Sequence, residues 1–227
     1  EKFIYFIGPA KDGSIDSLKA ELLGACITEL KSHGASNITI NIADLNDEIN
    51  RDAPGRLMGP WQGLAAAVSF WHECLDHRAP IEKYLSQLGE SLTGYLVTES
   101  VPQAFTPDWE GGARRPGVTQ YGANGKPENV SDEAFYHNWQ VDHSTLSFDL
   151  HPLRWSYVRN SVARPLTKGA PSYRAIVSEH FRALEDFTDD SRYFGSPEVL
   201  TAMIEEIPGF CDVNNMVSVP MSEYFFA

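Results

Sequence analysis

The sequence predicts an α+β fold in which two β-α-β-β-α-β units close on each other as an intrachain α+β barrel. Segments with the two-residue alternation of strands and segments with helical periodicity follow one another in this order twice along the 227 residues. A Pro- and Gly-rich stretch, PQAFTPDWEGGARRPG, separates the two occurrences. Each unit is the ferredoxin-like motif, whose sheet has helices on one face only, so each repeat can bury the open face of the other. We therefore predict a first ferredoxin-like repeat at 1–103, a linker at 104–117 and a second repeat at 118–227.

In the first repeat, four β-rich segments alternate with two helical ones. Ser14 can cap a helix that runs to about Lys31, and Gly34 suits the left-handed position after its end. A polar loop, NDEINRDAPG, follows the second strand. The predicted strands are FIYFI (3–7), NITINIADL (37–45), LAAAVSFW (64–71) and LTGYLVTE (92–99), and the second helix is APIEKYLSQLG (79–89).

The second repeat has the same order of segments. Ser131 begins a helix that includes FYHNWQVDHSTLSFDL (135–150), with acidic residues in its first turn where they suit the helix dipole. Ser196 caps a second helix, SPEVLTAMIEEI, with Pro197 at its first position. The predicted strands are GVTQYGA (117–123), RWSYVRNSV (154–162), YRAIVSEHF (173–181) and MVSVPMSEYFF (216–226).

The composition limits the possible partners and cofactors. A formal net charge of −13 argues against binding to nucleic acid, and no run of about 20 apolar residues is present that could span a membrane. The three cysteines lie far apart in no metal-binding spacing, which favours buried thiols in a reducing cytoplasm. We therefore expect a cytoplasmic protein with no metal site, and exposed sheet edges could join two copies into a homodimer.

The second half resembles the EthD family of dimeric α+β barrel proteins. The similarity lies in FYHNWQVDHSTL, LRWSYVRNSV, AIVSEHFRALEDF and FCDVNNMVSVPMSEY, which occur in the family's order and cover roughly 118–227. The first half keeps the order of elements, but its first helix has no Trp or His in the middle. The resemblance implies cofactor-free lyases, dehydratases and cyclases that act on aromatic or polyketide-like molecules, or accessory proteins of degradation clusters.

His143 is the first candidate for a catalytic residue. Helical spacing places it on one face with Phe135, Trp139, Leu146 and Leu150, so it should point at the sheet. It is either a core histidine bonded to the backbone or a general acid or base at the rim of a pocket between helix and sheet. Burial would hold its ring neutral and so leave a proton acceptor near physiological pH.

His180 is the second candidate. Alternation places it on one face of its strand with Ser178, and Glu179 and Phe181 on the other. It either reaches the pocket of His143 or fills the barrel interior. Two imidazoles across one pocket would allow one to take a proton while the other donates one.

Aromatic and polar side chains of the second repeat complete the predicted pocket. Tyr157 can act on a substrate oxygen as a third catalytic group, and Arg159 can either bind a carboxylate or form an ordinary surface ion pair. Three aromatic residues are either core or pocket walls that contact substrate: Tyr136, Trp139 and Phe181.

These residues predict a cofactor-independent lyase, such as a decarboxylase or dehydratase, acting on an aromatic acid or an intermediate of aromatic catabolism by histidine acid/base catalysis. Two alternatives remain open at this point. The chain could bind a small aromatic molecule without catalysis, as an accessory protein, or it could be a cofactor-free monooxygenase. The lyase and the monooxygenase differ in whether dioxygen is consumed.

Overall fold

Eight strands form a closed barrel in a computed structural model that describes residues 1–45, 49 and 63–227. The strands run in the order β1-β3-β2-β8-β5-β7-β6-β4 around the barrel, and neighbouring strands are antiparallel. Their bounds are β1 Lys2–Ile7, β2 Ser36–Ile42, β3 Ala66–Trp71, β4 Leu92–Gln103, β5 Val118–Gly125, β6 Arg154–Pro165, β7 Tyr173–Phe181 and β8 Asp212–Phe226. The predicted polar loop NDEINRDAPG lies outside the described residues, apart from Ile49.

Each half of the chain contributes four neighbouring strands to the barrel. The first half supplies β4-β1-β3-β2 and the second supplies β8-β5-β7-β6, and the pairs β2–β8 and β4–β6 join the two sets. The predicted α+β class and the closed barrel are thus confirmed. The ferredoxin-like description of each half and the boundaries at 103 and 118 stay predictions.

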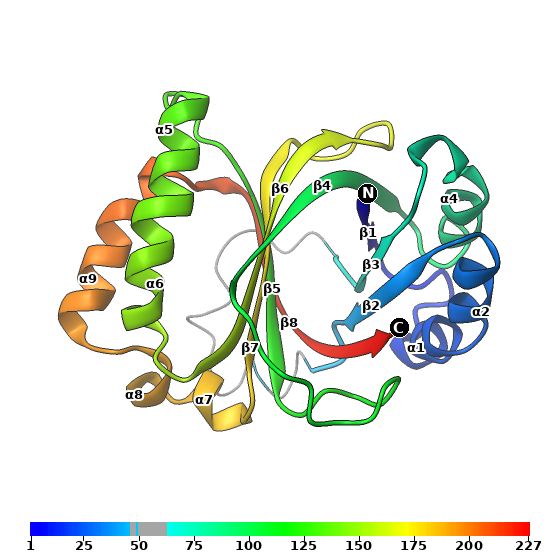
Figure 1. Cartoon of the computed structure of the whole chain (residues 1–227), viewed down its shortest axis with the longest axis horizontal. Helices are drawn as coiled ribbons and strands as arrows, with labels where there is room; N and C mark the ends of the chain where they lie inside the picture. The colour runs from blue at the N-terminus through cyan, green and yellow to red at the C-terminus, as the bar shows by residue number, and fades with distance from the viewer. Residues whose placement is uncertain (46–48, 50–62) are drawn as a thin grey trace.

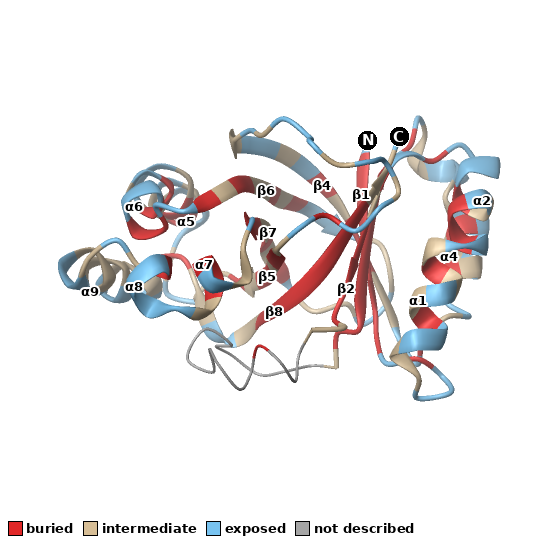
Figure 2. Ribbon diagram, turned by 90° about the horizontal axis from the view of Figure 1, so that it is seen from below, coloured by how far each residue is buried: buried red, intermediate tan, exposed pale blue. Residues whose placement is uncertain are grey.

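Helices cover the barrel on two opposite sides (Figures 1 and 2). The helices of the first half lie together on one side, and those of the second half lie on the other, with the strands between them. The first group is α1 Ile15–Leu23, α2 Ala25–Ser32 and α4 Ala79–Leu85, with the short turn η2 Leu75–His77. The second group is α5 Asp132–His137, η3 Asn138–His143, α6 Ser144–Leu150, α7 Leu184–Thr188, α8 Asp190–Tyr193, α9 Pro197–Glu206 and η4 Ile207–Gly209.

The barrel wall separates an interior core from the cores beneath the helices. Alternation along each strand decides which side a residue joins. On β1, Ile4 and Phe6 pack inside the barrel, whereas Phe3 and Tyr5 pack beneath α1, α2 and α4. On the other side, Phe135 belongs to a separate cluster between the second group of helices and the sheet.

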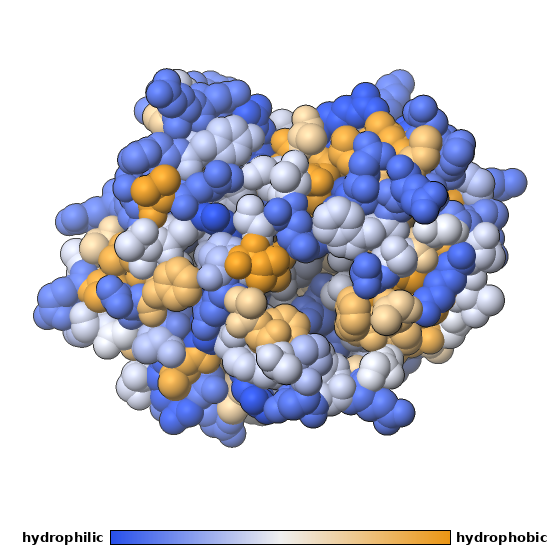
Figure 3. Space-filling view, viewed as in Figure 1, coloured by the Kyte–Doolittle hydropathy of each residue, from blue (hydrophilic) through white to orange (hydrophobic). Residues whose placement is uncertain are grey.

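The face of the protein in Figure 3 is mostly hydrophilic, as expected for a chain with a formal net charge of −13. Figure 3 shows hydrophilic side chains over most of one face, with apolar atoms in small separate groups. No helix among the described residues is long and apolar enough to cross a membrane.

Gly117, at the end of the segment 104–117, has a backbone conformation that only glycine tolerates. Its φ is +99°, and a Cβ at this position would lie 2.0 Å from the carbonyl oxygen of Phe181. Gly117→Ala is expected to lower the free energy of unfolding by about 2 kcal/mol or more, because left-handed strain and a steric clash add. Gly111→Ala in the same segment is the control, since its Cβ would meet no atom within 4 Å. Urea unfolding of both variants measures the difference, and equal stabilities would contradict the prediction.

Candidate functional site

The long helix of the second half contains a π-helical turn that reorients His143. Residues 132–150 form α5, η3 and α6 in succession, and η3 is a π-helix over Asn138–His143. A π turn adds one residue to the helical repeat, so the face toward the sheet passes from Trp139 to Ser144. The Ser144 hydroxyl donates to the Trp139 carbonyl at 2.9 Å, five residues back. His143 consequently does not point at the sheet as predicted but is turned toward α9.

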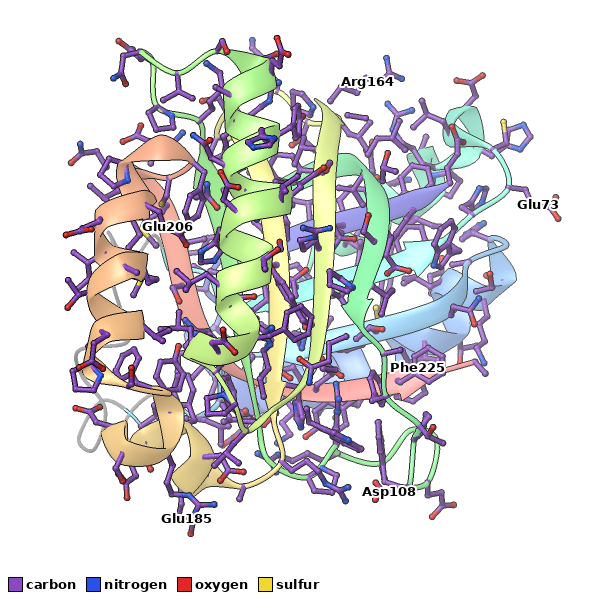
Figure 4. All side chains as sticks on the ribbon, turned by 60° about the vertical axis from the view of Figure 1, so that its left-hand side comes forward. Glu73, Asp108, Arg164, Glu185, Glu206 and Phe225 are labelled. Atoms are coloured by element: carbon purple, nitrogen blue, oxygen red, sulfur yellow. The ribbon has the colours of Figure 1, made fainter. Side chains whose placement is uncertain are left out.

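His143 forms a hydrogen-bonded pair with Glu206 of α9. Its Nδ1 lies 2.6 Å from Oε1 of Glu206, and both side chains are largely buried. Figure 4 labels Glu206 on α9, on the side next to the helix formed by α5 and α6. A carboxylate accepts hydrogen bonds only, so Nδ1 carries a proton, and in the neutral form of the ring the lone pair is on Nε2. Among the described residues, Nε2 of His143 has no hydrogen-bond partner.

This pair borders a cavity between the helices and the outer face of the barrel, here called the helix–sheet cavity. It has a volume of about 180 Å³. The His143 ring packs on Phe210, with ring centroids 4.4 Å apart. The cavity is lined mainly by apolar and aromatic side chains, with a few polar groups: Gln120, Asn124, His143, Leu150, His151, Glu179, Tyr193, Phe194, Met203, Ile207, Phe210, Cys211, Met216 and Ser218.

A second imidazole in this cavity belongs to His151, which the sequence did not single out. Its Nδ1 lies 3.0 Å from the Tyr193 carbonyl oxygen and therefore donates to it, which places the lone pair on Nε2. Burial lowers the pKa of His151 to about 4, although the nearby Glu179 carboxylate acts in the opposite direction. His151 is therefore neutral at pH 7, and its Nε2 can accept a hydrogen bond from a ligand.

Glu179 supplies a buried negative charge at the inner wall of the cavity. Arg154 donates to it from Nη1 at 2.7 Å, and this arginine is 2% exposed. Burial alone would raise the pKa of Glu179, but the positive charge of Arg154 and its hydrogen bond outweigh burial and lower it. The Arg154–Glu179 pair is therefore ionised and already satisfied, so it shapes the field of the cavity without being free to bind a charged ligand.

His180 lies on the opposite side of the sheet from His143, so the predicted shared pocket is wrong. The His180 side chain points into the barrel, where its Nδ1 is 2.8 Å from the Thr119 hydroxyl. Its Nε2 is 2.7 Å from the Pro116 carbonyl oxygen and must donate to it. Burial lowers the pKa of His180 to about 4, assisted by the positive charge of Arg115. Both nitrogens of this neutral ring are occupied, which favours the interpretation of His180 as a barrel-interior histidine.

The other five predicted site residues do not line the helix–sheet cavity. Arg159 donates from Nη1 to the Gln140 carbonyl at 2.9 Å and to the Ser144 hydroxyl, and thereby spans the π turn. Tyr157 is buried beneath the guanidinium of Arg154, which lies 4.2 Å from the ring centroid. The three aromatic residues pack in clusters beside the cavity: Tyr136, Trp139 and Phe181. Of the seven predicted residues, only His143 borders the cavity.

Sequence reasoning missed Glu206, His151 and Glu179 for different reasons. Glu206 is 63 residues from His143, and nothing local distinguishes it from the neighbouring Glu205. His151 directly follows the predicted helix, where neither helical spacing nor strand alternation assigns its side chain to a face. Alternation did place Glu179 on the face opposite His180, so the signal was present, but the sequence did not indicate which face the helices cover.

No cluster of three or more His, Cys, Asp or Glu side chains with the geometry of a metal site occurs in the described part of the chain.

The sequence matches no family model and no curated protein, so the likeness to the EthD family stays a resemblance of short motifs.

Solved structures share the fold at low sequence identity. An anthrone oxidase-like protein matches with a TM-score of 0.56 and 8% identity over 99% of this chain and 92% of that chain. A protein of Fusobacterium nucleatum named "putative monooxygenase" matches with a TM-score of 0.55 and 6% identity over 100% and 92%. A chlorite dismutase mutant of Candidatus Nitrospira defluvii matches with a TM-score of 0.52 and 11% identity over 97% and 90%. These similarities establish a common fold.

Proposed function

We propose that the chain is an enzyme that removes a proton from a C–H or O–H group of a small, uncharged aromatic compound in the helix–sheet cavity, with His143 as the base. The observation that carries the proposal is the His143–Glu206 pair beside an apolar cavity. Glu206 holds the proton on Nδ1, directs the Nε2 lone pair to the substrate and stabilises the imidazolium that forms when His143 takes a proton.

The cavity suits an uncharged aromatic ring with hydroxyl groups. Its volume of about 180 Å³ exceeds the roughly 150 Å³ that holds one benzene ring, and larger molecules would extend through its mouth. Nε2 of His143 and Nε2 of His151 can each accept a hydrogen bond from a phenolic hydroxyl. Among the described residues that line the cavity there is no lysine or arginine, so an aromatic acid is less well matched than a neutral phenol or anthrone.

We propose oxidation by dioxygen as the reaction that follows proton removal. A carbanion or phenolate formed in an apolar site can reduce dioxygen directly, and a methylene compound then gives a ketone and water: R₂CH₂ + O₂ → R₂C=O + H₂O. Two proteins with this fold are named as an anthrone oxidase-like protein and a "putative monooxygenase". These names support dioxygen and an anthrone as the first substrates to test. A lyase would use the same base and differ only in losing a fragment instead of consuming dioxygen.

Arg159 is proposed as a positioning residue for the base. Its guanidinium bonds to Gln140 and Ser144 across the π turn that directs His143 toward α9. Tyr157, Trp139 and Phe181 would support the walls of the site from behind without touching the substrate.

The direct test is the replacement of His143 by Gln, with anthrone as the probe. His143→Gln is expected to lower the rate of dioxygen consumption and anthraquinone formation by roughly 10²–10⁴-fold, the usual contribution of a positioned base. His137→Gln is the matched control, since His137 lies on the same helix and is exposed to solvent. It should retain the wild-type rate.

Three other outcomes would overturn the proposal. Full activity of the His143→Gln protein with an unchanged circular dichroism spectrum would remove His143 from the mechanism. Release of carbon dioxide from hydroxybenzoic acids without oxygen would identify a lyase. A thermal shift with these aromatic compounds, but no product by mass spectrometry, would identify a binding protein.

A further inference from the structure

The interior of the barrel contains a second cavity, here called the lumen cavity. It has a volume of about 270 Å³, and each of the eight strands contributes at least one lining side chain. One end of the lumen is filled by an apolar cluster that includes Phe6, Tyr95 and Ile176. The segment between the two halves supplies Phe105, Pro107 and Trp109 to the other, hollow end. Nothing in the proposed reaction uses this space.

The lumen cavity is separate from the helix–sheet cavity. Gln120 and Glu179 line the helix–sheet cavity, whereas their strand neighbours Tyr121 and Ser178 line the lumen cavity. Because successive side chains point to opposite faces of a strand, the barrel wall lies between the two spaces. A ligand in one cavity therefore makes no contact with the other.

The charged groups in the lumen cavity are paired within the protein. Arg115 donates from Nη1 to Glu223 at 2.7 Å and from Nη2 to the Ser156 hydroxyl at 2.9 Å. Lys2 is paired with Glu99. Two positive and two negative charges leave no net charge at the site, so the cavity favours an uncharged ligand.

Two buried polar atoms in the lumen cavity have no partner. Asn160 is 2% exposed, and its Oδ1 accepts no hydrogen bond, while its Nδ2 donates weakly to the Ile176 carbonyl at 3.4 Å. Nε of Arg115, which is also 2% exposed, donates no hydrogen bond. An unpaired buried polar atom is costly, and in native proteins nearly all such atoms are satisfied. A ligand hydroxyl can donate to Asn160 Oδ1, and a ligand oxygen can accept from Arg115 Nε.

The hollow end of the lumen cavity has aromatic walls. Phe105 and Trp109 stack with ring centroids 5.7 Å apart, and the Arg115 guanidinium lies 3.9 Å from the Phe105 centroid. Tyr121 and Phe225 also line the cavity. These flat apolar surfaces fit the faces of a ring, and the volume is larger than one benzene ring needs.

We propose that the lumen cavity is a binding site for a small, uncharged, hydroxylated ring compound, whose hydroxyl donates to Asn160 Oδ1. The ring lies against the aromatic side chains of the 104–117 segment. This site takes up its ligand by hydrogen bonding and packing and performs no chemistry. It is independent of the reaction proposed for the helix–sheet cavity.

Resorcinol is the probe for this site, with 1,3-dimethoxybenzene and 3-hydroxybenzoate as comparison ligands. A phenol also suits the helix–sheet cavity, so binding at the lumen is the part of the calorimetric resorcinol signal that the wild type shows and Asn160→Leu loses. The dimethyl ether, which has no donor, and the benzoate, which is charged, should each bind at least about tenfold more weakly. A crystal soaked in resorcinol should show the ring in the lumen with its hydroxyl at Asn160 Oδ1.

Asn160→Leu and His143→Gln locate the binding and separate it from catalysis. Asn160→Leu should weaken resorcinol binding at least about tenfold and leave the protein as stable as wild type or more so, because it removes an unsatisfied polar atom. His143→Gln should leave resorcinol binding at the lumen unchanged, whatever its effect on turnover. Equal resorcinol affinity in wild type and Asn160→Leu, or a soaked crystal with only ordered water in the lumen, would overturn the proposal.

Discussion

Arg154→Met is expected to lower the free energy of unfolding by about 3–5 kcal/mol, because it leaves the Glu179 carboxylate buried without its partner. Arg154 is 2% exposed, and its guanidinium contacts Glu179, Gln103, Ser147 and the Tyr157 ring. Breaking one side of such a pair costs far more than the pair contributes as a whole, because the remaining charge cannot reach water. Urea unfolding followed by circular dichroism measures the change.

A second substitution tests this explanation. Glu179→Gln in the Arg154→Met background removes the uncompensated charge and should recover part of the loss, so the two substitutions should not add. The control is Arg182→Met, which breaks the solvent-exposed pair with Asp108 and should cost less than about 1 kcal/mol. Additive effects of the two changes at 154 and 179 would mean that packing, and not the buried charge, accounts for the loss.

Stability is expected to fall as the pH decreases from about 6.5 to about 4, because two buried histidines resist protonation in the folded state. Burial lowers the pKa of His151 and of His180 from an ordinary value of 6.5 to about 4. In this window the unfolded chain binds a proton at each position and the folded protein does not, so stability rises with pH. Each histidine accounts for roughly 3 kcal/mol between the two pKa values, and its effect is fully present above pH 6.5.

The two histidines can be separated by mutation. His151→Gln and His180→Asn should each reduce the difference in proton uptake between folded and unfolded states by about one proton near pH 5. The free energy of unfolding at a series of pH values gives this slope. A slope unchanged in both variants would show that these rings are protonated in the folded protein, in contradiction to their buried positions.

The strands and the helix starts could be predicted because their determinants are local and repeated. Alternation in YRAIVSEHF correctly divided Ser178 and His180 from Glu179. The caps at Ser14, Ser131 and Ser196 each accept the expected backbone hydrogen bond at a helix start. These features depend on neighbours within a few residues, for which the sequence holds the full information.

The candidate site was predicted only in part, because one extra residue in the π-helical turn changes which side chains of the helix face the sheet. Ideal periodicity aligns His143 with Trp139 on the sheet-facing side, but the π turn transfers that position to Ser144. The turn is stabilised by Arg159, which lies on β6, 15 residues beyond Ser144 in the chain. No pattern within the helix itself indicates that contact.

The sequence by itself determined the eight strands, the long helices and which residues of a strand share a face, and it indicated an α+β barrel. Only the tertiary structure decided that His143 meets Glu206 and shares its cavity with His151, while His180 lies inside the barrel. The spacing of apolar residues in strands and helices follows from local backbone geometry, so it can be recognised from the order of residues alone. The meeting of two charged or aromatic groups depends on how distant elements pack, and that is set by the closed barrel as a whole.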